Sequence, residues 1–412
     1  MKRLDQRGLG VLGLGHASVD LCQGAVPALL PFFIAEHGWS YGQAAALVLA
    51  ATIGSSIVQP AFGHWADKVS LPWLMPAGVA AGLGGLALSG VAESYGLVFA
   101  AIAVSGFGVG AFHPEAARFA NYVSGDRRAT GMSMFSLGGN IGFALGPAII
   151  TPAVLLLGLS GTLVVVPIGV IVAIVVARET ERLRTFQPGG GATAPGDPDA
   201  PEAWGPFARL GGAIASRSAV YFGLQTFIPL WLVDHLGASK ALGNAALISM
   251  LAAGAIGTLA GGRLADRIGR RPVLVGSMAL QLPLVFLLIA VGPTAAVAVA
   301  ALIGIVTIGT FSVTVVMGQE YLPGRVGLAS GVTLGLAIGL GGVWASALGL
   351  VADSFGLTTV MDVIAVLPLV GFALALSLPR TAPGTPVATP RRPSGRRSAP
   401  TRRATSAAET GT

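Results

Sequence analysis

The sequence GRLADRIGRR occupies residues 262–271, and a shorter copy of the same pattern, GHWADK, occupies residues 63–68. Each copy stands at the end of the second long apolar stretch in its own half of the chain. A hydrophobic unit that is duplicated together with the same charged loop is typical of secondary transporters. The two copies therefore predict a membrane protein built from two parallel repeats.

Composition supports this prediction. Hydrophobic residues make up 53% of the 412 residues and charged residues 10%, and the mean hydropathy is +0.76. Soluble domains carry about 25% charged residues, so we expect most of this chain to lie in lipid. Apolar runs of roughly 20 residues, long enough to cross a bilayer as helices, cover residues 9–34, 43–65, 72–92, 96–120, 131–155, 159–177, 207–233, 242–264, 273–291, 295–317, 327–351 and 357–378.

The sequence thus predicts an all-α membrane protein with twelve transmembrane helices in two six-helix bundles. The loops between runs are too short to build a water-facing shell, which disfavours a soluble helical protein. The alternating short strands that a transmembrane barrel requires are missing from the sequence.

Composition also predicts the domain boundaries. We expect an N-terminal bundle over residues 1–178, a flexible cytoplasmic linker over 179–206, a C-terminal bundle over 207–379 and a disordered basic cytoplasmic tail over 380–412. The linker is rich in Gly and Pro, and the tail in Pro, Ser, Thr and Arg. Seven arginines and one glutamate in the tail carry most of the net charge of +7, so the charge does not indicate a nucleic-acid surface. Contact with anionic lipid and a purely solvated tail both remain open.

Lysine and arginine fix the expected orientation. Almost all of them fall in loops on the side of the N-terminus, and Lys240 is the exception. Because such loops stay in the cytoplasm, we expect both termini there and the protein in the bacterial inner membrane. A single cysteine, Cys22, excludes an intramolecular disulfide and a thiolate metal cluster. We expect no metal and no cofactor.

Ionisable residues inside the apolar runs are the candidates for function, because they are costly in a membrane. His16, Asp20 and Gln23 fall on one helix face. His113 in the fourth run is expected at the depth of His16. We predict Asp20 and His113 as the proton-coupling residues, helped by His16 and Glu115; a local ion pair between Glu115 and Arg118 is an equally good interpretation of Glu115.

Arg217 is the one deep cation of the second half, at a level equivalent to His16. A buried guanidinium suits a phosphonate, phosphate or carboxylate, although Arg217 could instead neutralise Asp20 or Glu115. Further substrate-binding candidates are Gln23, Asn140 and Gln225; for Asn140 and Gln225 the alternative is a simple bond to a neighbouring helix, as single amides in membrane helices often make. In the duplicated loops, a glycine allows close helix approach and a carboxylate favours a helix N-terminus. We therefore predict gating roles for Gly63, Asp67, Gly262, Asp266, Arg267 and Arg270.

These loops resemble those of the major facilitator superfamily. Within it, the first half resembles the fosmidomycin resistance protein group of exporters, through GH at 15–16 with Asp20, QGAVPALLP at 23–31, QP at 59–60 and AFHPEAAR at 111–118. The sequence GFALGP at 142–147 resembles a motif of drug–proton antiporters, which adds Gly142, Gly146 and Pro147 to the gating candidates. Two features depart from the family: the fourth run lacks a mid-membrane arginine, and the first charged loop is incomplete.

The resemblance implies alternating access by rocking bundles and efflux of a small compound by proton antiport. The group's named substrate is a phosphonate antibiotic, so antibiotic resistance is the implied consequence. We expect no enzyme and no nucleic-acid partner, but a monomer whose partners are a small-molecule substrate, protons and the lipid bilayer. An importer or symporter of a small metabolite, or a membrane sensor that does not transport, remains the alternative.

Overall fold

The computed structural model describes residues 4–68, 71–125, 127–186 and 202–380, without the side chains of 57–68, 128–129, 326–327, 330 and 334–335. All regular secondary structure in this part of the chain is helical. The first half contains α1 Gln6–His37, α2 Tyr41–Lys68, α3 Leu74–Ser89, α4 Tyr95–Val123, α5 Arg128–Leu157, a 3₁₀ turn at Gly158–Val164 and α6 Val165–Leu183. The second half contains α7 Trp204–Leu230, a π-helical turn at Trp231–His235, α8 Lys240–Ile268, α9 Arg270–Ala290, α10 Pro293–Ile308, α11 Phe311–Tyr321, a 3₁₀ turn at Pro323–Arg325 and α12 Val326–Leu376.

Each predicted apolar run corresponds to helix, with two differences in continuity. The run at 295–317 is divided into α10 and α11 at Gly309, whose backbone lies against Gly257 and Gly261 of α8. The runs at 327–351 and 357–378 form the single element α12, which turns sharply at Gly356, where φ is 83°. By length and composition, seven segments of the described chain qualify as membrane spans, and two of these segments each cover two predicted runs.

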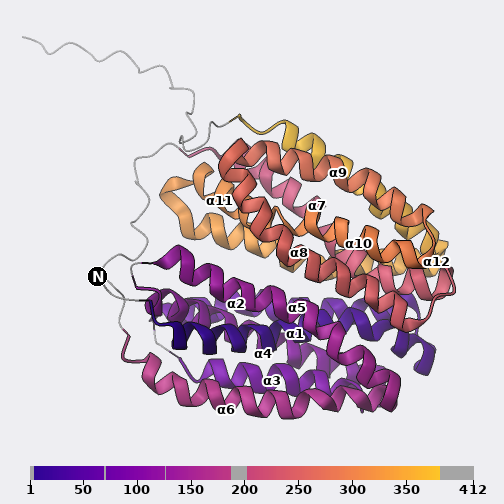
Figure 1. The fold of residues 1–412 in the computed structure, drawn as a ribbon, viewed down its shortest axis with the longest axis horizontal. Helices are drawn as coiled ribbons and strands as arrows, with labels where there is room; N and C mark the ends of the chain where they lie inside the picture. The colour runs from indigo at the N-terminus through magenta and orange to yellow at the C-terminus, as the bar shows by residue number, and fades with distance from the viewer. Residues whose placement is uncertain (1–3, 69–70, 126, 187–201, 381–412) are drawn as a thin grey trace, which may run out of the picture.

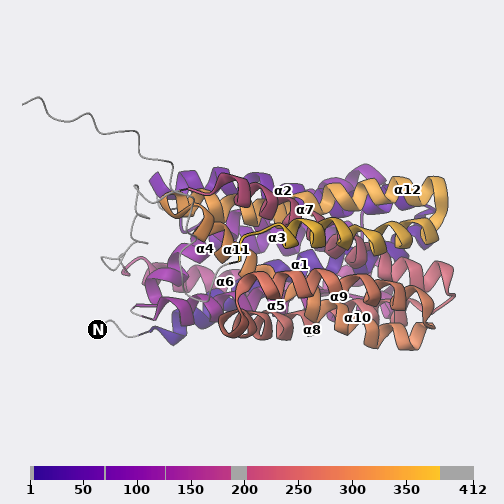
Figure 2. The ribbon, with the colours of Figure 1, turned by 90° about the horizontal axis from the view of Figure 1, so that it is seen from above.

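The helices form two six-helix bundles, with α1–α6 in one and α7–α12 in the other (Figures 1 and 2). In the first bundle the most extensive contact is between α1 and α5, and in the second it is between α7 and α12. The bundles meet mainly through α2 against α12 and through α5 against α8. The helices α6 and α7 enter the predicted linker from both ends, while residues 187–201 of that linker and 381–412 of the predicted tail lie outside the described residues.

The two halves repeat one backbone contact. The Asp5 N–H donates to the Val123 carbonyl at 2.9 Å, and the Ala203 N–H donates to the Tyr321 carbonyl at 2.7 Å. Each bond ties the entry of a bundle's first helix to the end of its fourth span. We call this face of the molecule the basic face, because Arg7, Arg182, Arg270 and Arg325 also lie here; α1 and α7 end at the opposite face.

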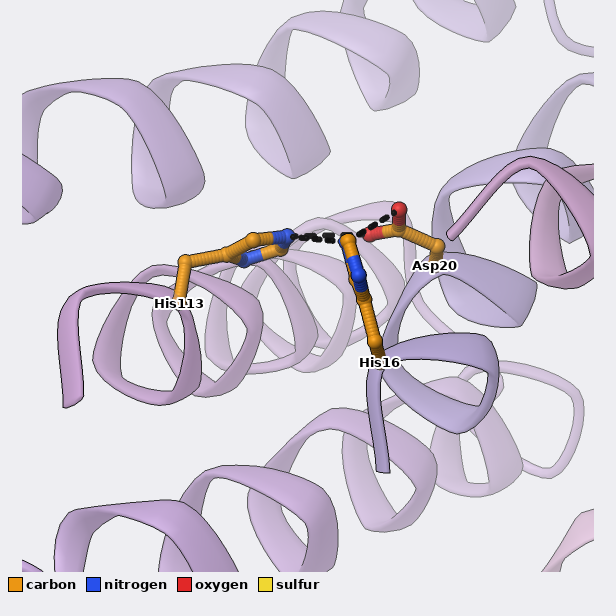
Figure 3. Close-up of side chains that lie close together, drawn as sticks. All are labelled: His16, Asp20 and His113. Atoms are coloured by element: carbon orange, nitrogen blue, oxygen red, sulfur yellow. Dashed lines mark hydrogen bonds and ion pairs between the residues drawn. The ribbon is translucent and has the colours of Figure 1, made fainter. Parts of the chain in front are cut away.

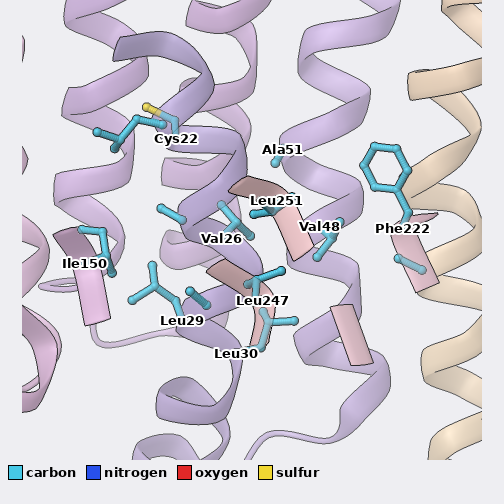
Figure 4. Close-up of a cluster of buried hydrophobic side chains, with 14 of the residues drawn as sticks. Cys22, Val26, Leu29, Leu30, Val48, Ala51, Ile150, Phe222, Leu247 and Leu251 are labelled. Atoms are coloured by element: carbon cyan, nitrogen blue, oxygen red, sulfur yellow. The ribbon is translucent and has the colours of Figure 1, made fainter. Parts of the chain in front are cut away.

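A buried hydrophobic cluster continues from one bundle into the other (Figure 4). It contains residues of α1, α2 and α5 together with residues of α7 and α8. Labelled members are Cys22, Val26, Leu29, Leu30, Val48, Ala51, Ile150, Phe222, Leu247 and Leu251. The bundles are thus packed together in the halves of α1 and α7 that lead to the opposite face.

Glycines set the distance between α1 and α5. A Cβ added to Gly24 would lie 2.0 Å from the Phe143 carbonyl oxygen. A Cβ on Gly142 would lie 2.2 Å from the Ala17 carbonyl oxygen, and one on Gly146 2.4 Å from the Leu21 carbonyl oxygen. Because membrane helices gain little from hydrophobic burial against one another, such close backbone packing supplies much of their attraction. It also fixes how α5 faces the ionisable residues of α1.

Candidate functional site

A cluster of three ionisable side chains lies between α1 and α4 (Figure 3). His16 Nε2 is 3.1 Å from Asp20 Oδ2, one helical turn away on α1. From α4, His113 Nε2 approaches His16 Nε2 at 3.1 Å and Asp20 Oδ1 at 3.4 Å. His16 and Asp20 are 8% and 6% exposed, whereas the His113 side chain is 22% exposed, so the cluster is buried on the α1 side and partly open at His113. The structure therefore brings together the three residues that the sequence placed at one depth.

Backbone carbonyls determine which nitrogen of each imidazole carries hydrogen. His16 Nδ1 lies 2.8 Å from the Phe135 carbonyl oxygen, and His113 Nδ1 lies 2.8 Å from the Val109 carbonyl oxygen. A carbonyl oxygen can only accept, so each Nδ1 donates and each Nε2 of a neutral ring is an acceptor. If both rings are neutral, the two Nε2 atoms and the Asp20 carboxylate are all hydrogen-bond acceptors and face one another. At least one additional proton among them is therefore needed for a stable arrangement.

Neighbouring residues hold this geometry in place. The Phe135 ring stacks on His16 with a centroid distance of 4.2 Å. Gly139, one turn further along α5, faces the cluster directly: a Cβ there would lie 2.5 Å from Asp20 Oδ2 and 2.6 Å from His16 Nε2. Glycine is therefore the residue that leaves room for the cluster at this position.

Glu115 does not join the cluster. It is fully buried, lies 2.5 Å from the Arg118 guanidinium and accepts a hydrogen bond of 2.7 Å from the Leu71 N–H. These bonds attach the segment that precedes α3 to α4. The local ion pair with Arg118, one of the two interpretations of Glu115, is the arrangement observed.

Arg217 lies deep in α7 without an acidic partner in the described part of the chain. The residue is 4% exposed, and its Nε has no hydrogen-bond partner. The guanidinium carbon lies 5.4 Å from the centroid of the Phe311 ring, a cation–π contact. Asp20 pairs with the two histidines and Glu115 with Arg118, so in this conformation Arg217 neutralises neither of them. A buried cation that lacks a counter-ion is a candidate anion site.

The three amide candidates differ in their surroundings. Gln23 is buried and donates to the Ala51 carbonyl of α2 at 3.2 Å. Gln225, two turns beyond Arg217 on α7, is 1% exposed, and its Oε1 has no partner. Asn140 is half-buried on α5 next to Gly139. Gln23 thus bonds a neighbouring helix, whereas Gln225 retains an unused acceptor on the helix that carries Arg217.

With this geometry described, the comparisons with known proteins identify the family. A model of the Major Facilitator Superfamily matches residues 12–346 and 210–408. The chain belongs to the major facilitator superfamily. It is therefore a secondary transporter of a small-molecule substrate, a multi-pass membrane protein and not an enzyme.

Two curated relatives cover nearly the whole transporter. The fosmidomycin resistance protein of Escherichia coli (strain K12) is 32% identical over 384 residues, which are 90% of this chain and 92% of the relative. The uncharacterized MFS-type transporter YfnC of Bacillus subtilis (strain 168) is 33% identical over 376 residues, again 90% and 92% of the two chains. The resemblance to the superfamily that the sequence indicated is confirmed.

Solved structures show the same fold at low sequence identity. A bacterial homologue of the human lysosomal transporter Spinster, in an inward-facing and occupied conformation, has a TM-score of 0.72 at 16% identity and covers 89% of this chain and 95% of its own. The nucleoside transporter NupG, solved as a point mutant, has a TM-score of 0.71 at 14% identity, with 90% and 99% covered. These structures confirm the two-bundle architecture.

The predicted gating residues differ in what they contact. Gly63 and Asp67 lie near the end of α2, where the side chains are outside the described residues. In the second copy, Asp266 and Arg267 are exposed, and no atom lies within 4 Å of a Cβ added to Gly262. Arg270 pairs with Glu320 of α11 at 2.5 Å, inside its own bundle. Gly142 and Gly146 lie in the seam with α1, as described above, and Pro147 follows them on α5.

Three residues near the site have no clear signal in the sequence. In the sequence, Gly139 appears only as one member of the Gly138–Gly139 pair. Such pairs occur wherever membrane helices pack closely through small residues. Phe311 has no local signal, because its contact with Arg217 depends on how α11 packs on α7. Tyr221 lies one turn beyond Arg217 on α7, and its ring packs edge-on against Phe222 with a centroid distance of 5.1 Å.

Metal binding is the other chemistry open to the cluster. His16, Asp20 and His113 each offer one ligand atom, and these atoms lie within 4.8 Å of one another. Two imidazole nitrogens and one carboxylate oxygen form a donor set that zinc accepts. Binding of a proton requires no movement of these side chains, because their atoms already lie at hydrogen-bond distance from one another.

Proposed function

We propose that this protein exports a small anionic compound, of the phosphonate type, in exchange for protons. The observation that carries the proposal is the His16–Asp20–His113 cluster, in which His16 and Asp20 are buried and the hydrogen-bond pattern calls for a proton. A transporter coupled to protons needs a group that gains and loses a proton during the cycle while it is shielded from bulk water. The name of the Escherichia coli relative adds the expectation of antibiotic efflux.

The cluster connects protonation to helix contacts. His16 and Asp20 belong to α1, and His113 belongs to α4, so a proton held among them links these two helices. Loss of that proton leaves three acceptors facing one another at 3.1 to 3.4 Å, which weakens the contact. A change in the packing of α1 against α4 is the expected mechanical result of deprotonation.

Arg217 is the proposed contact for the anionic group of the substrate. Its guanidinium offers donors in a planar fork that matches phosphonate, phosphate or carboxylate oxygens. Gln225 supplies an acceptor on the same helix. The helices α1 and α7, which carry Asp20 and Arg217, contact each other, so in this proposal an anion bound at Arg217 affects the cluster through the contact of these two helices.

The proposed orientation places the basic face in the cytoplasm of a bacterium, with both termini there and the protein in the inner membrane.

Replacement of Asp20 tests the proposed function. In proteoliposomes with an imposed pH gradient, wild-type protein is expected to move fosmidomycin against its concentration gradient, and Asp20→Asn is expected to lose this movement. Exchange of labelled for unlabelled fosmidomycin without a gradient should continue in Asp20→Asn, because that exchange needs no net proton transfer. Asp362→Asn, which changes an exposed carboxylate of α12, is the matched control and should behave as wild type. Gradient-driven export by Asp20→Asn at the wild-type rate would remove Asp20 from the mechanism.

A further inference from the structure

The start of α2 lies at the face opposite the basic face and carries its own cap. The Ser40 N–H donates to Gln43 Oε1 at 3.0 Å, and the Gln43 N–H donates to Ser40 Oγ at 3.2 Å. This reciprocal pair is a capping box, which satisfies two backbone groups at a helix N-terminus. All of these contacts stay inside the first bundle.

A carboxylate from the second bundle sits on the same helix start. Asp353 Oδ2 accepts one hydrogen bond from Ser40 Oγ at 2.8 Å and another from the Gly42 N–H at 3.0 Å. A negative charge is favoured at a helix N-terminus, both by the free N–H groups and by the helix dipole. Asp353 therefore caps α2 in trans, and this cap joins the two bundles.

Close backbone approach makes the contact specific. A Cβ added to Gly42 would lie 2.6 Å from Asp353 Oδ2. A Cβ on Gly349, one turn before Asp353, would lie 2.9 Å from the Gly42 Cα and 2.7 Å from the Ala45 Cβ. Glycines at both positions allow the carboxylate to reach the helix start. Asp353 also precedes the sharp turn of α12 at Gly356, so it lies where the chain reverses at this face.

A second hydrogen bond from the same short segment reaches the second bundle. Tyr41 donates its hydroxyl hydrogen to Asp234 Oδ2 at 3.2 Å, in the turn that follows α7. Burial raises the pKa of Asp234, while the Tyr41 hydrogen bond and nearby Lys240 act in the other direction. Three consecutive residues, 40 to 42, are thus bonded to two carboxylates of the other bundle.

We propose that Asp353 and the Ser40–Gly42 segment form the outer gate of this transporter, with the Tyr41–Asp234 bond as its second part. The gate is closed in the conformation described and breaks when the bundles separate at this face. Ser40 and Asp353 are exposed, so water can replace the bonds that are lost. The capping box of Ser40 and Gln43 remains when Asp353 leaves, so α2 keeps a satisfied N-terminus in both states. These two features make the gate reversible.

Asp353→Ala tests the gate through the opening of the outer face, independently of substrate and proton coupling. In a Cys22→Ser background, Val48→Cys provides a reporter thiol, because Val48 is 3% exposed in the interface of α2 with the second bundle. An impermeant thiol reagent added from outside should label this cysteine only when the outer face opens. Loss of two charge-assisted hydrogen bonds is expected to raise the labelling rate about tenfold. Tyr41→Phe should raise it by a smaller factor.

Two controls distinguish a gate from general loosening. Tyr95→Phe removes a tyrosine hydrogen bond of 3.1 Å to the Gln43 carbonyl, within the first bundle, and should leave the labelling rate unchanged. Asp362→Asn removes an exposed carboxylate of α12 and should also have no effect. Equal labelling rates in wild type and Asp353→Ala would overturn the proposal, and so would an equal increase in both controls.

A cross-link supplies a test that does not depend on the stability of Asp353→Ala. In the same Cys22→Ser background, Ser40→Cys with Asp353→Cys should form a disulfide on oxidation and hold the outer face closed. Labelling of a third cysteine at Val48→Cys is expected to stop on oxidation and to return on reduction. Failure of the pair to cross-link, or unchanged labelling after cross-linking, would contradict the gate.

Discussion

At the scale of single residues, two backbone carbonyls orient the histidines of the cluster, because those of Phe135 and Val109 bond Nδ1 of His16 and of His113. His16 and Asp20 could be placed on one helix face because the helical period fixes it, and His113 could be placed at their depth by counting from the ends of its span. The protonation pattern depends on the carbonyls of Phe135 and Val109, and no sequence pattern specifies those partners. Glu115 had two interpretations because Arg118, three residues on, is within reach in any helix.

Arg217 gives the prediction that belongs to this scale. Arg217→Lys keeps a positive charge but loses the planar fork, so export of fosmidomycin should need about tenfold more substrate for half-maximal rate. Arg217→Gln should lower affinity further. The check is the concentration dependence of gradient-driven flux in proteoliposomes.

The matched control for Arg217 is Arg209→Lys, at a position two turns earlier on α7. Arg209 donates to the Ser377 carbonyl at 2.6 Å and lies near the basic face. Its replacement should leave the concentration dependence unchanged. If Arg217→Lys and Arg209→Lys behave alike, Arg217 does not contact the substrate.

At the scale of helices, the apolar runs predicted every element, and the structure differs at helix ends and breaks. The helix α1 extends three residues beyond its predicted run at each end, because hydropathy detects only the part that faces hydrocarbon. The division between α10 and α11 at Gly309 could not be predicted, since it reflects contact with glycines of α8. The same holds for the contact between α1 and α5. The sequence shows the single glycines, but it does not show which backbone atoms of the other helix they contact.

Gly139 tests how the seam positions the cluster. Gly139→Ala would place a methyl group 2.5 Å from Asp20 Oδ2, so either α5 must move or the cluster must rearrange. We expect gradient-driven export to fall at least about tenfold, since displaced catalytic and binding geometry commonly costs this much. Gly84→Ala on α3, where no atom lies within 4 Å of the added carbon, should retain wild-type export.

Membrane insertion provides the second readout for Gly139→Ala. The variant should be recovered from the membrane in wild-type amounts and should still bind fosmidomycin, because Arg217 lies on another helix. Wild-type export by Gly139→Ala would show that the spacing of α1 and α5 at this point is unimportant for coupling.

At the scale of the whole molecule, the duplicated loops predicted two bundles and the correct superfamily. The contact between the bundles was beyond sequence reasoning. The gating candidates came from the charged loops at the basic face, where Arg270 is bonded inside its own bundle. The bonds that join the bundles at the opposite face involve Ser40, Tyr41, Asp234 and Asp353, which read in sequence as ordinary loop residues.

Asn244 extends this bundle contact into the membrane interior. Its side-chain N–H groups donate to the Ala28 carbonyl at 3.0 Å and to Thr151 Oγ1 at 2.9 Å, both in the first bundle. Together with the hydrophobic cluster of Figure 4, these bonds hold the bundles together in the halves that lead to the opposite face. In the cycle that we propose, the central residues are reached from the basic face, and this access reverses when the gate at the opposite face opens.

Direct recording of protons during transport is the measurement that tests this cycle most closely. With a pH-sensitive dye inside proteoliposomes and no imposed gradient, adding fosmidomycin on one side should drive protons the opposite way across wild-type protein. Asp20→Asn should move fosmidomycin down its gradient with no proton signal. Wild-type transport of fosmidomycin without proton movement, or with protons travelling in the same direction, would contradict the account.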